Sequence, residues 1–284
     1  MGLKDAGVYR SYAGVFSCAS FSRILDTGDL SPLEIRFRKF EISKHVCTYI
    51  DFIKYMYSSL CKHYRCEYVY KNAIVNDILK TYKKSDNVVA INEFKIGNSI
   101  ADIAMFNGES IAFEIKTEFD SDRRIDSQLN SYESVFNKTY IVTDESCIER
   151  YADLNPRVGL YSLDVHGGRV NITLRREAVS SDDLDVDILM RSLNTNEYKA
   201  IIYEAFGELP NVSSFKMYKE CLALMKTLPK ETVRKMAISQ FKKRKKNSRL
   251  YNSYISPLRH ICVGLDLDKK HYDNLIKLLT KNMI

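Results

Sequence analysis

Residues 88–132 constrain the fold more than any other stretch of the chain, because short apolar runs alternate there with turn residues. Three such runs, separated by breaks that contain glycine and asparagine, predict three consecutive antiparallel strands. The predicted strands cover residues 88–95, 100–106 and 110–117. A predicted helix with Gln128 and Tyr132 follows them. Acidic residues interrupt the apolar runs, and such a local conflict is typical of a functional site.

The turn between the second and third strands decides whether Asp102 and Glu114 share a face of the sheet. A strict two-residue turn at Asn107-Gly108 would pair Asp102 with Phe113 and point it away from Glu114. A three-residue turn at 107–109 would instead place Asp102 opposite Glu114, with Cβ atoms about 4.5–5.5 Å apart. We therefore predict a turn that is not of the two-residue type, and two carboxylates on one face.

Two neighbouring carboxylates, with a backbone carbonyl and waters, form a normal site for Mg²⁺, with Mn²⁺ as an alternative. Lys116 shares the face of Glu114, because side chains alternate along a strand. An ammonium group there can orient a metal-bound water and stabilise negative charge in a transition state. Glu93, at the end of the first strand, is either a further ligand or base, or a solvated side chain. The charge pattern suits phosphodiester hydrolysis.

These residues resemble the PD-(D/E)XK nuclease superfamily. Asp102 followed by Glu114-Ile115-Lys116 matches its acidic and E-x-K elements, although Ala101 stands where the family name has proline. Gln128 and Tyr132, one helical turn apart, match the Q-x-x-x-Y signature of RecB-type members. The wider layout is similar to a small, poorly characterised bacterial family of predicted nucleases.

The resemblance implies an α/β fold, a mixed sheet flanked by helices, and a metal-dependent DNA nuclease or other phosphodiester hydrolase of the bacterial cytoplasm. Asp102 and Glu114 would hold Mg²⁺, Lys116 would serve the attacking water, and Gln128 and Tyr132 would shape the site. The family type suggests phage defence, mobile elements or DNA repair. Two alternatives stay open: an inactive nucleic-acid-binding or protein-interaction module on this fold, and a nuclease directed at RNA. Each residue alone also has an ordinary structural interpretation.

Basic side chains elsewhere are candidates for phosphate contacts. The chain has a formal net charge of +7, which is compatible with a nucleic-acid partner but does not require one. The most basic run ends a predicted helix, where cations also complement the helix dipole. Arg124 lies one turn before Gln128. The candidate contacts are Arg124, Lys242, Lys243, Arg244, Lys245, Lys246 and Arg249.

Composition suggests three segments, with a change to serine and aspartate at residues 178–187. We predict an N-terminal helical extension at 1–66, a nuclease-like core at 67–178 and a C-terminal helical domain at 179–284. Seven scattered cysteines indicate reduced thiols and a cytoplasmic protein. No stretch predicts a membrane span. A homodimer is an open alternative.

Overall fold

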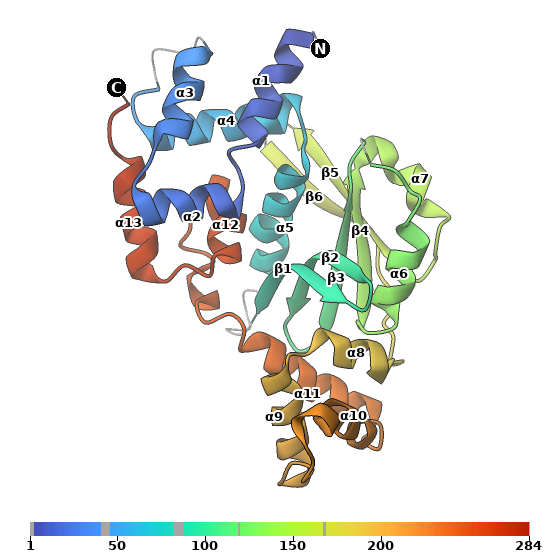
Figure 1. The fold of residues 1–284 in the computed structure, drawn as a ribbon. Coiled ribbons are helices and arrows are strands. Elements are labelled where there is room, and N and C mark those ends of the chain that lie inside the picture. The colour runs from blue at the N-terminus through green and yellow to red at the C-terminus, as the bar shows by residue number, and fades with distance from the viewer. Residues whose placement is uncertain (1–2, 41–45, 82–87, 119, 167–168, 284) are drawn as a thin grey trace. The chain divides into compact units, whose positions relative to one another are not determined.

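The computed structural model describes residues 3–40, 46–81, 88–118, 120–166 and 169–283 of the chain (Figure 1). Residue contacts divide the chain into two compact units, and both differ from the three predicted segments. The helical unit comprises Met1–Asp86, Leu163–Thr173 and Asn247–Ile284. The sheet unit comprises Asn87–Ser162 and Leu174–Lys246.

A six-stranded mixed sheet flanked by helices confirms the predicted α/β class. In the order β1-β2-β3-β4-β5-β6, the first three strands are antiparallel neighbours and β4 runs parallel to β3. The parallel step needs a crossover connection, which α6 (Ile125–Glu133) supplies. The strands are β1 (Val89–Ile96), β2 (Ser99–Phe106), β3 (Ser110–Lys116), β4 (Lys138–Asp144), β5 (Gly159–His166) and β6 (Arg169–Arg176).

The turn between β2 and β3 has the predicted three residues, 107–109. Asn107 N–H donates to the Glu109 carbonyl oxygen at 3.1 Å. Gly108 has φ 119°, a conformation that glycine adopts at little cost. Ile103 consequently pairs with Phe113, the register that a three-residue turn dictates. The predicted turn and register are therefore confirmed.

Helices of the sheet unit follow β4 and β6. Residues 186–206 form two helices, because Asn194 starts a new helix after α8 ends. Asn194 Oδ1 accepts the N–H groups of Asn196 and Glu197, and the Glu197 carboxylate in turn accepts the Asn194 N–H at 2.8 Å, which forms a capping box. These helices are η1 (Glu145–Cys147), α7 (Ile148–Ala152), α8 (Val186–Ser192), α9 (Thr195–Phe206), α10 (Ser214–Met225) and α11 (Lys230–Lys242).

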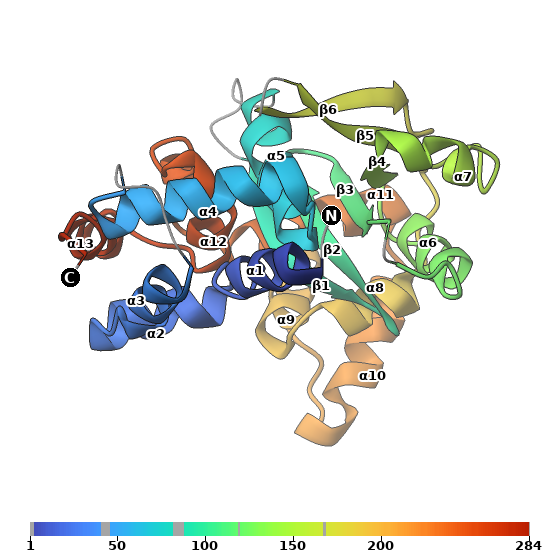
Figure 2. The ribbon, with the colours of Figure 1, turned by 90° about the horizontal axis from the view of Figure 1, so that it is seen from above.

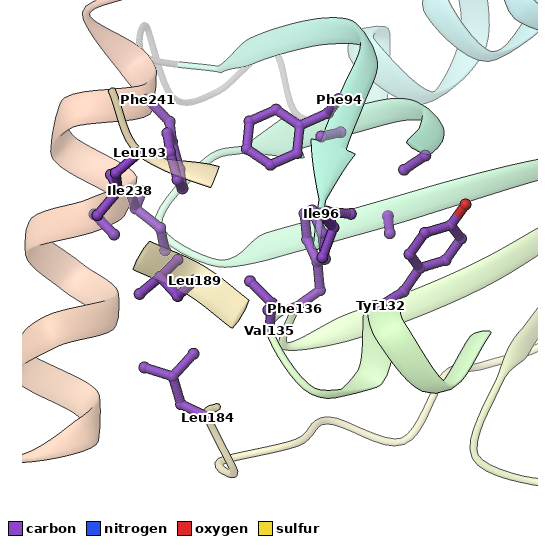
Figure 3. Packing of buried hydrophobic residues seen from close by; sticks show 14 of the residues in the cluster. Phe94, Ile96, Tyr132, Val135, Phe136, Leu184, Leu189, Leu193, Ile238 and Phe241 are labelled. Atoms are coloured by element: carbon purple, nitrogen blue, oxygen red, sulfur yellow. The ribbon is translucent and has the colours of Figure 1, made fainter. Parts of the chain in front are cut away.

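One apolar core joins the sheet to the helices that follow residue 178 (Figure 3). The ring of Phe241 on α11 lies 5.0 Å from Phe94 on β1 and 5.1 Å from Phe106 on β2, centroid to centroid. Phe136, after α6, stacks on Phe106 at 6.2 Å. The predicted boundary at residue 178 therefore does not separate two cores.

The helical unit joins the C-terminal end of the chain to the segment before α4. Near the start of α4, Thr48 forms a β-bridge with Asn282, and Tyr49 N–H donates to the Lys281 carbonyl oxygen at 3.3 Å. Figures 1 and 2 both show α13 at this end of α4. Asn72 on α5 binds the turn before α12, donating to the Ser256 carbonyl oxygen at 2.8 Å. The helices are α1 (Leu3–Ala13), α2 (Cys18–Thr27), α3 (Ser31–Lys39), α4 (Tyr49–His63), α5 (Glu67–Thr81), η2 (Ser248–Leu250), η3 (Ser256–Leu258), α12 (Arg259–Gly264) and α13 (Lys269–Leu279).

The structure also describes the state of the cysteines and the hydropathy of the helices. All seven cysteines are free thiols, as predicted. Within the described ranges, no helix combines the length and the apolar character that crossing a membrane requires.

Candidate functional site

The structure brings five predicted site residues together at one place in the sheet unit. Asp102 comes from β2, Glu114 and Lys116 from β3, and Gln128 and Tyr132 from α6. Glu114 and Lys116 share a face because strand side chains alternate, while Gln128 and Tyr132 share a face because they are one helical turn apart. We call these five residues the charged cluster.

Glu114 is the centre of the charged cluster. Its Oε1 lies 2.8 Å from Lys116 Nζ, and its Oε2 lies 2.7 Å from the Tyr132 hydroxyl. Glu114 is 3% exposed and Lys116 is 8% exposed, so this ion pair is buried. Burial and the adjacent Glu114 carboxylate raise the pKa of Tyr132 well above its usual range, so the phenol stays neutral. Both carboxylate oxygens of Glu114 are therefore engaged inside the protein.

Gln128 and Ile100 complete the partners of Lys116 and Tyr132. Lys116 Nζ donates to Gln128 Oε1 at 3.2 Å, and Gln128 Nε2 lies 3.5 Å from the Tyr132 hydroxyl. That hydroxyl is also 2.6 Å from the Ile100 carbonyl oxygen, so its single proton has two acceptors within reach. The polar groups of the cluster thus satisfy one another.

At the end of the β2–β3 ladder, the carboxylate of Asp102 takes the place of a backbone hydrogen-bond acceptor. The ladder ends with Ile103 opposite Phe113, and one further step places Asp102 opposite Glu114, as predicted. There, Asp102 Oδ2 accepts the Ile115 N–H at 2.8 Å. Its carboxylate also contributes to the raised pKa of Tyr132, after burial and Glu114.

Glu93 lies on β1, the strand next to β2, and its environment differs from that of the charged cluster. It is exposed and has φ 51°, a left-handed backbone conformation that is uncommon for residues other than glycine. The β1–β2 pairs on either side of it are Asn92 with Ile103 and Phe94 with Ala101. Local strain of this kind occurs where surrounding structure fixes the backbone.

One supporting residue was missed by the sequence analysis. Thr143 on β4 is fully buried, and its hydroxyl donates to the Lys116 carbonyl oxygen at 2.7 Å. The β3–β4 register pairs these two residues directly. Only the pairing of strands distant in sequence identifies this contact, so no local signal could have found it.

The Mg²⁺ site at Asp102 and Glu114 stays a prediction. Over the described residues, no three or more histidine, cysteine, aspartate or glutamate side chains are grouped to hold a metal ion. A cation at Glu114 would have to compete with Lys116 and Tyr132 for the carboxylate oxygens.

The basic run at 242–246 is divided between internal and exposed side chains. Arg244 binds both carboxylate oxygens of Glu197 at 2.6 Å and lies 4.7 Å from the centre of the Phe241 ring. A phosphate contact by Arg244 would therefore require an internal ion pair to open. Lys243 and Lys246 are exposed, whereas Lys242, Arg244 and Lys245 are half-buried.

The two remaining predicted phosphate contacts lie elsewhere. Arg124 is exposed at the start of α6, where the partial positive charge of the helix dipole is unfavourable for a cation. Arg249 is exposed and belongs to the helical unit. Their contacts with phosphate stay predictions.

Comparison with known proteins decides the family. The family model for bacteriophage P4 protein cII matches residues 61–261, which is more than half of the chain. The chain belongs to the bacteriophage P4 protein cII family. Protein cII of Enterobacteria phage P4 is 26% identical over 182 residues. That match spans 61% of this chain and 66% of the relative, just under two thirds of the relative's length.

Among solved structures, the chain is similar to the SPO1766 protein of unknown function from Silicibacter pomeroyi. The identity is 14%, the TM-score is 0.34, and the match covers 51% of this chain and 94% of that one. A similarity at this level carries no functional argument.

The P4 cII match overturns the predicted membership of the PD-(D/E)XK superfamily, since no such nuclease family is indicated. The expected metal-dependent nuclease or hydrolase activity is likewise wrong, together with the roles in phage defence and DNA repair derived from it. The physical reason is visible in the charged cluster. Residue types that suit metal chemistry also suit a buried network, and here Glu114 uses its oxygens on Lys116 and Tyr132.

Proposed function

We propose that this protein binds DNA without cleaving it. The distribution of charge between the two units carries this proposal. The helical unit contains 21 lysines and arginines against 13 aspartates and glutamates, whereas the sheet unit contains 22 against 23. The whole positive excess of the chain thus belongs to the helical unit. A localised positive excess is the electrostatic footprint expected of a phosphate-binding surface.

Exposed cations of the helical unit are available for phosphates. In the described part of the chain, several of them have no carboxylate within ion-pair distance. They are Arg10, Arg38, Lys62, Lys270, Lys277 and Lys281. In the sheet unit, the exposed Lys226, Lys230 and Lys235 each pair with a carboxylate. The exposed Arg191, Lys216 and Lys219 of that unit have no such partner in the described part of the chain, so the net charge distinguishes the two units and the pairing alone does not. Unpaired cations can release counterions from DNA without first breaking an ion pair.

We assign the charged cluster a structural role within this proposal. Asp102 connects β2 to β3 through the Ile115 N–H, and Tyr132 connects α6 to Glu114 on β3. A buried carboxylate and ammonium that neutralise each other tie these elements together in one arrangement, since either charge alone would be costly to bury. This structural role requires no catalytic activity.

The proposal predicts that cations of the helical unit govern DNA affinity. Replacing Arg38, Lys270 and Lys277 together by alanine should weaken binding to a short duplex. It should also reduce the slope of log K against log salt by about 0.9 for each phosphate that is no longer neutralised. Fluorescence anisotropy with a labelled duplex over a series of salt concentrations measures both quantities.

The matched control replaces three exposed lysines of the sheet unit, Lys226, Lys230 and Lys235, by alanine. These side chains already have carboxylate partners, so their removal should leave the salt slope unchanged. Equal losses of affinity in the two triple variants would show that the location of the positive charge does not matter, and would contradict the proposal.

A further inference from the structure

A cleft between α1 and α4 in the helical unit has the character of a ligand site. Its volume is about 340 Å³, and its walls include Tyr9, Tyr12, Tyr55, Lys62 and His63. This volume lies within the range of about 300–1,000 Å³ that small-molecule sites usually have. Figures 1 and 2 show the two helices lying side by side.

The walls of the cleft contain an aromatic platform built from both helices. The rings of Tyr9 on α1 and His63 on α4 stack with centroids 5.3 Å apart and planes at 19°. Tyr12 stands edge-on between Tyr9, at 6.4 Å, and Tyr55, at 6.3 Å. Tyr55 and His63 are exposed, so ring surface remains for a flat ligand. Stacking on such surfaces is the usual way that proteins hold unpaired bases.

Tyr12 supplies a polar group inside the cleft. The residue is 2% exposed, and its hydroxyl has no hydrogen-bond partner in the described part of the chain. Burial, with Tyr55 and Tyr9 nearby, raises the pKa of Tyr12 to about 12, which keeps the hydroxyl protonated at neutral pH. A protonated hydroxyl on the wall of the cleft can donate a hydrogen bond to a polar ligand or accept one from it.

The charge of the cleft favours an anion. Lys62 is exposed and has no carboxylate partner among the described residues, and the described walls contain neither aspartate nor glutamate. Lys62 and His63 also belong to the last turn of α4. A phosphate beside Lys62 would therefore meet an unpaired ammonium and no carboxylate, and this attraction opposes the partial negative charge at the C-terminal end of α4.

We infer that this cleft holds an unpaired nucleotide of a single-stranded nucleic acid, with the base on the Tyr9 and His63 rings and its phosphate at Lys62. The inference rests on the proposed function and adds a preference for single strands at one site. Tyr12 would bind the polar edge of the base. A free nucleotide shares this chemistry, so the test includes one.

Fluorescence anisotropy of a labelled oligothymidylate tests the inference on the full chain. Base–aromatic stacking is worth about 1–3 kcal/mol per base, so Tyr9→Leu should weaken single-strand binding by roughly 5- to 150-fold. Lys62→Ala should weaken it and reduce its salt slope by about 0.7. Tyr12→Phe keeps the ring, so a loss of affinity at unchanged melting temperature would report the hydroxyl alone.

The control Tyr203→Leu removes an exposed tyrosine of the sheet unit and should bind like the wild type. Duplex binding that persists in Tyr9→Leu and Tyr12→Phe, with single-strand binding lost in the cleft variants, supports the inference. Duplex binding with single-strand binding that ignores the cleft variants overturns it and leaves the proposed function standing. Absence of all nucleic-acid binding overturns the proposed function itself. A protein that binds thymidine monophosphate but does not bind the oligonucleotide would also overturn the inference, because the occupant would then be a free nucleotide.

Discussion

Replacing Glu114 by alanine should lower the free energy of unfolding by about 3–5 kcal/mol, because it leaves the buried Lys116 ammonium without its counter-charge. The pair is separated by 2.8 Å, and Lys116 is 8% exposed, so water cannot readily take over the missing interaction. The Tyr132 hydroxyl loses an acceptor as well. Urea denaturation followed by circular dichroism measures the change.

A double variant separates the buried charge from the other effects of the substitution. Glu114→Gln combined with Lys116→Met removes both charges while keeping similar volumes, and should recover most of the stability that Glu114→Ala removes. The opposite result for Glu114→Ala alone, stability equal to or above that of the wild type, would contradict a structural cluster. Residues retained for chemistry commonly cost stability, so their removal tends to stabilise the fold.

Replacing Phe241 by alanine should destabilise the sheet unit by about 3–5 kcal/mol, the usual cost of deleting a buried phenylalanine. Phe241 is 2% exposed, and its ring contacts Phe94 and Phe106 on two strands. Because α11 shares the core of the sheet, the destabilisation should also reach the strands. Amide hydrogen exchange should accelerate in β1 and β2 as well as in α11.

Phe215→Ala is the matched control, because Phe215 lies on α10 in the same unit but is 95% exposed. Its effect should stay within about 0.5 kcal/mol. Unchanged exchange in β1 and β2 for Phe241→Ala would contradict the shared core. It would instead favour the separate C-terminal domain expected from the sequence.

The sequence predicted the sheet well because the signals there are local. Alternating side chains and the Asn107-Gly108 break determine the β2–β3 register, and with it the position of Asp102 opposite Glu114. The helical unit was harder to predict from the sequence. Residues of α1 show no sustained apolar period. The short α2 does carry local signals, because Phe21 and Ile24 lie on one buried face, Ser17 caps the helix and Gly28 ends it with φ 68°. Contacts between segments distant in sequence, such as Thr48 with Asn282, leave no local signal at all.

The function could not be predicted from the same residues, for a physical reason. The motif at Asp102, Glu114 and Lys116 specifies that three side chains meet, and they do meet near Gln128 and Tyr132. It does not specify whether their charges act on a ligand or on one another. The family is instead identified by a match over residues 61–261, and most of these residues lie outside the motif.

The most direct test of DNA binding without cleavage is one measurement on the wild-type chain. An end-labelled duplex is incubated with saturating protein and Mg²⁺ at low salt, the complex is quantified on a native gel, and the recovered DNA is run on a denaturing gel. We expect a retarded complex that dissociates as salt rises, containing full-length strands. Shortened strands that disappear with EDTA, or no complex at low salt, would contradict the proposed function.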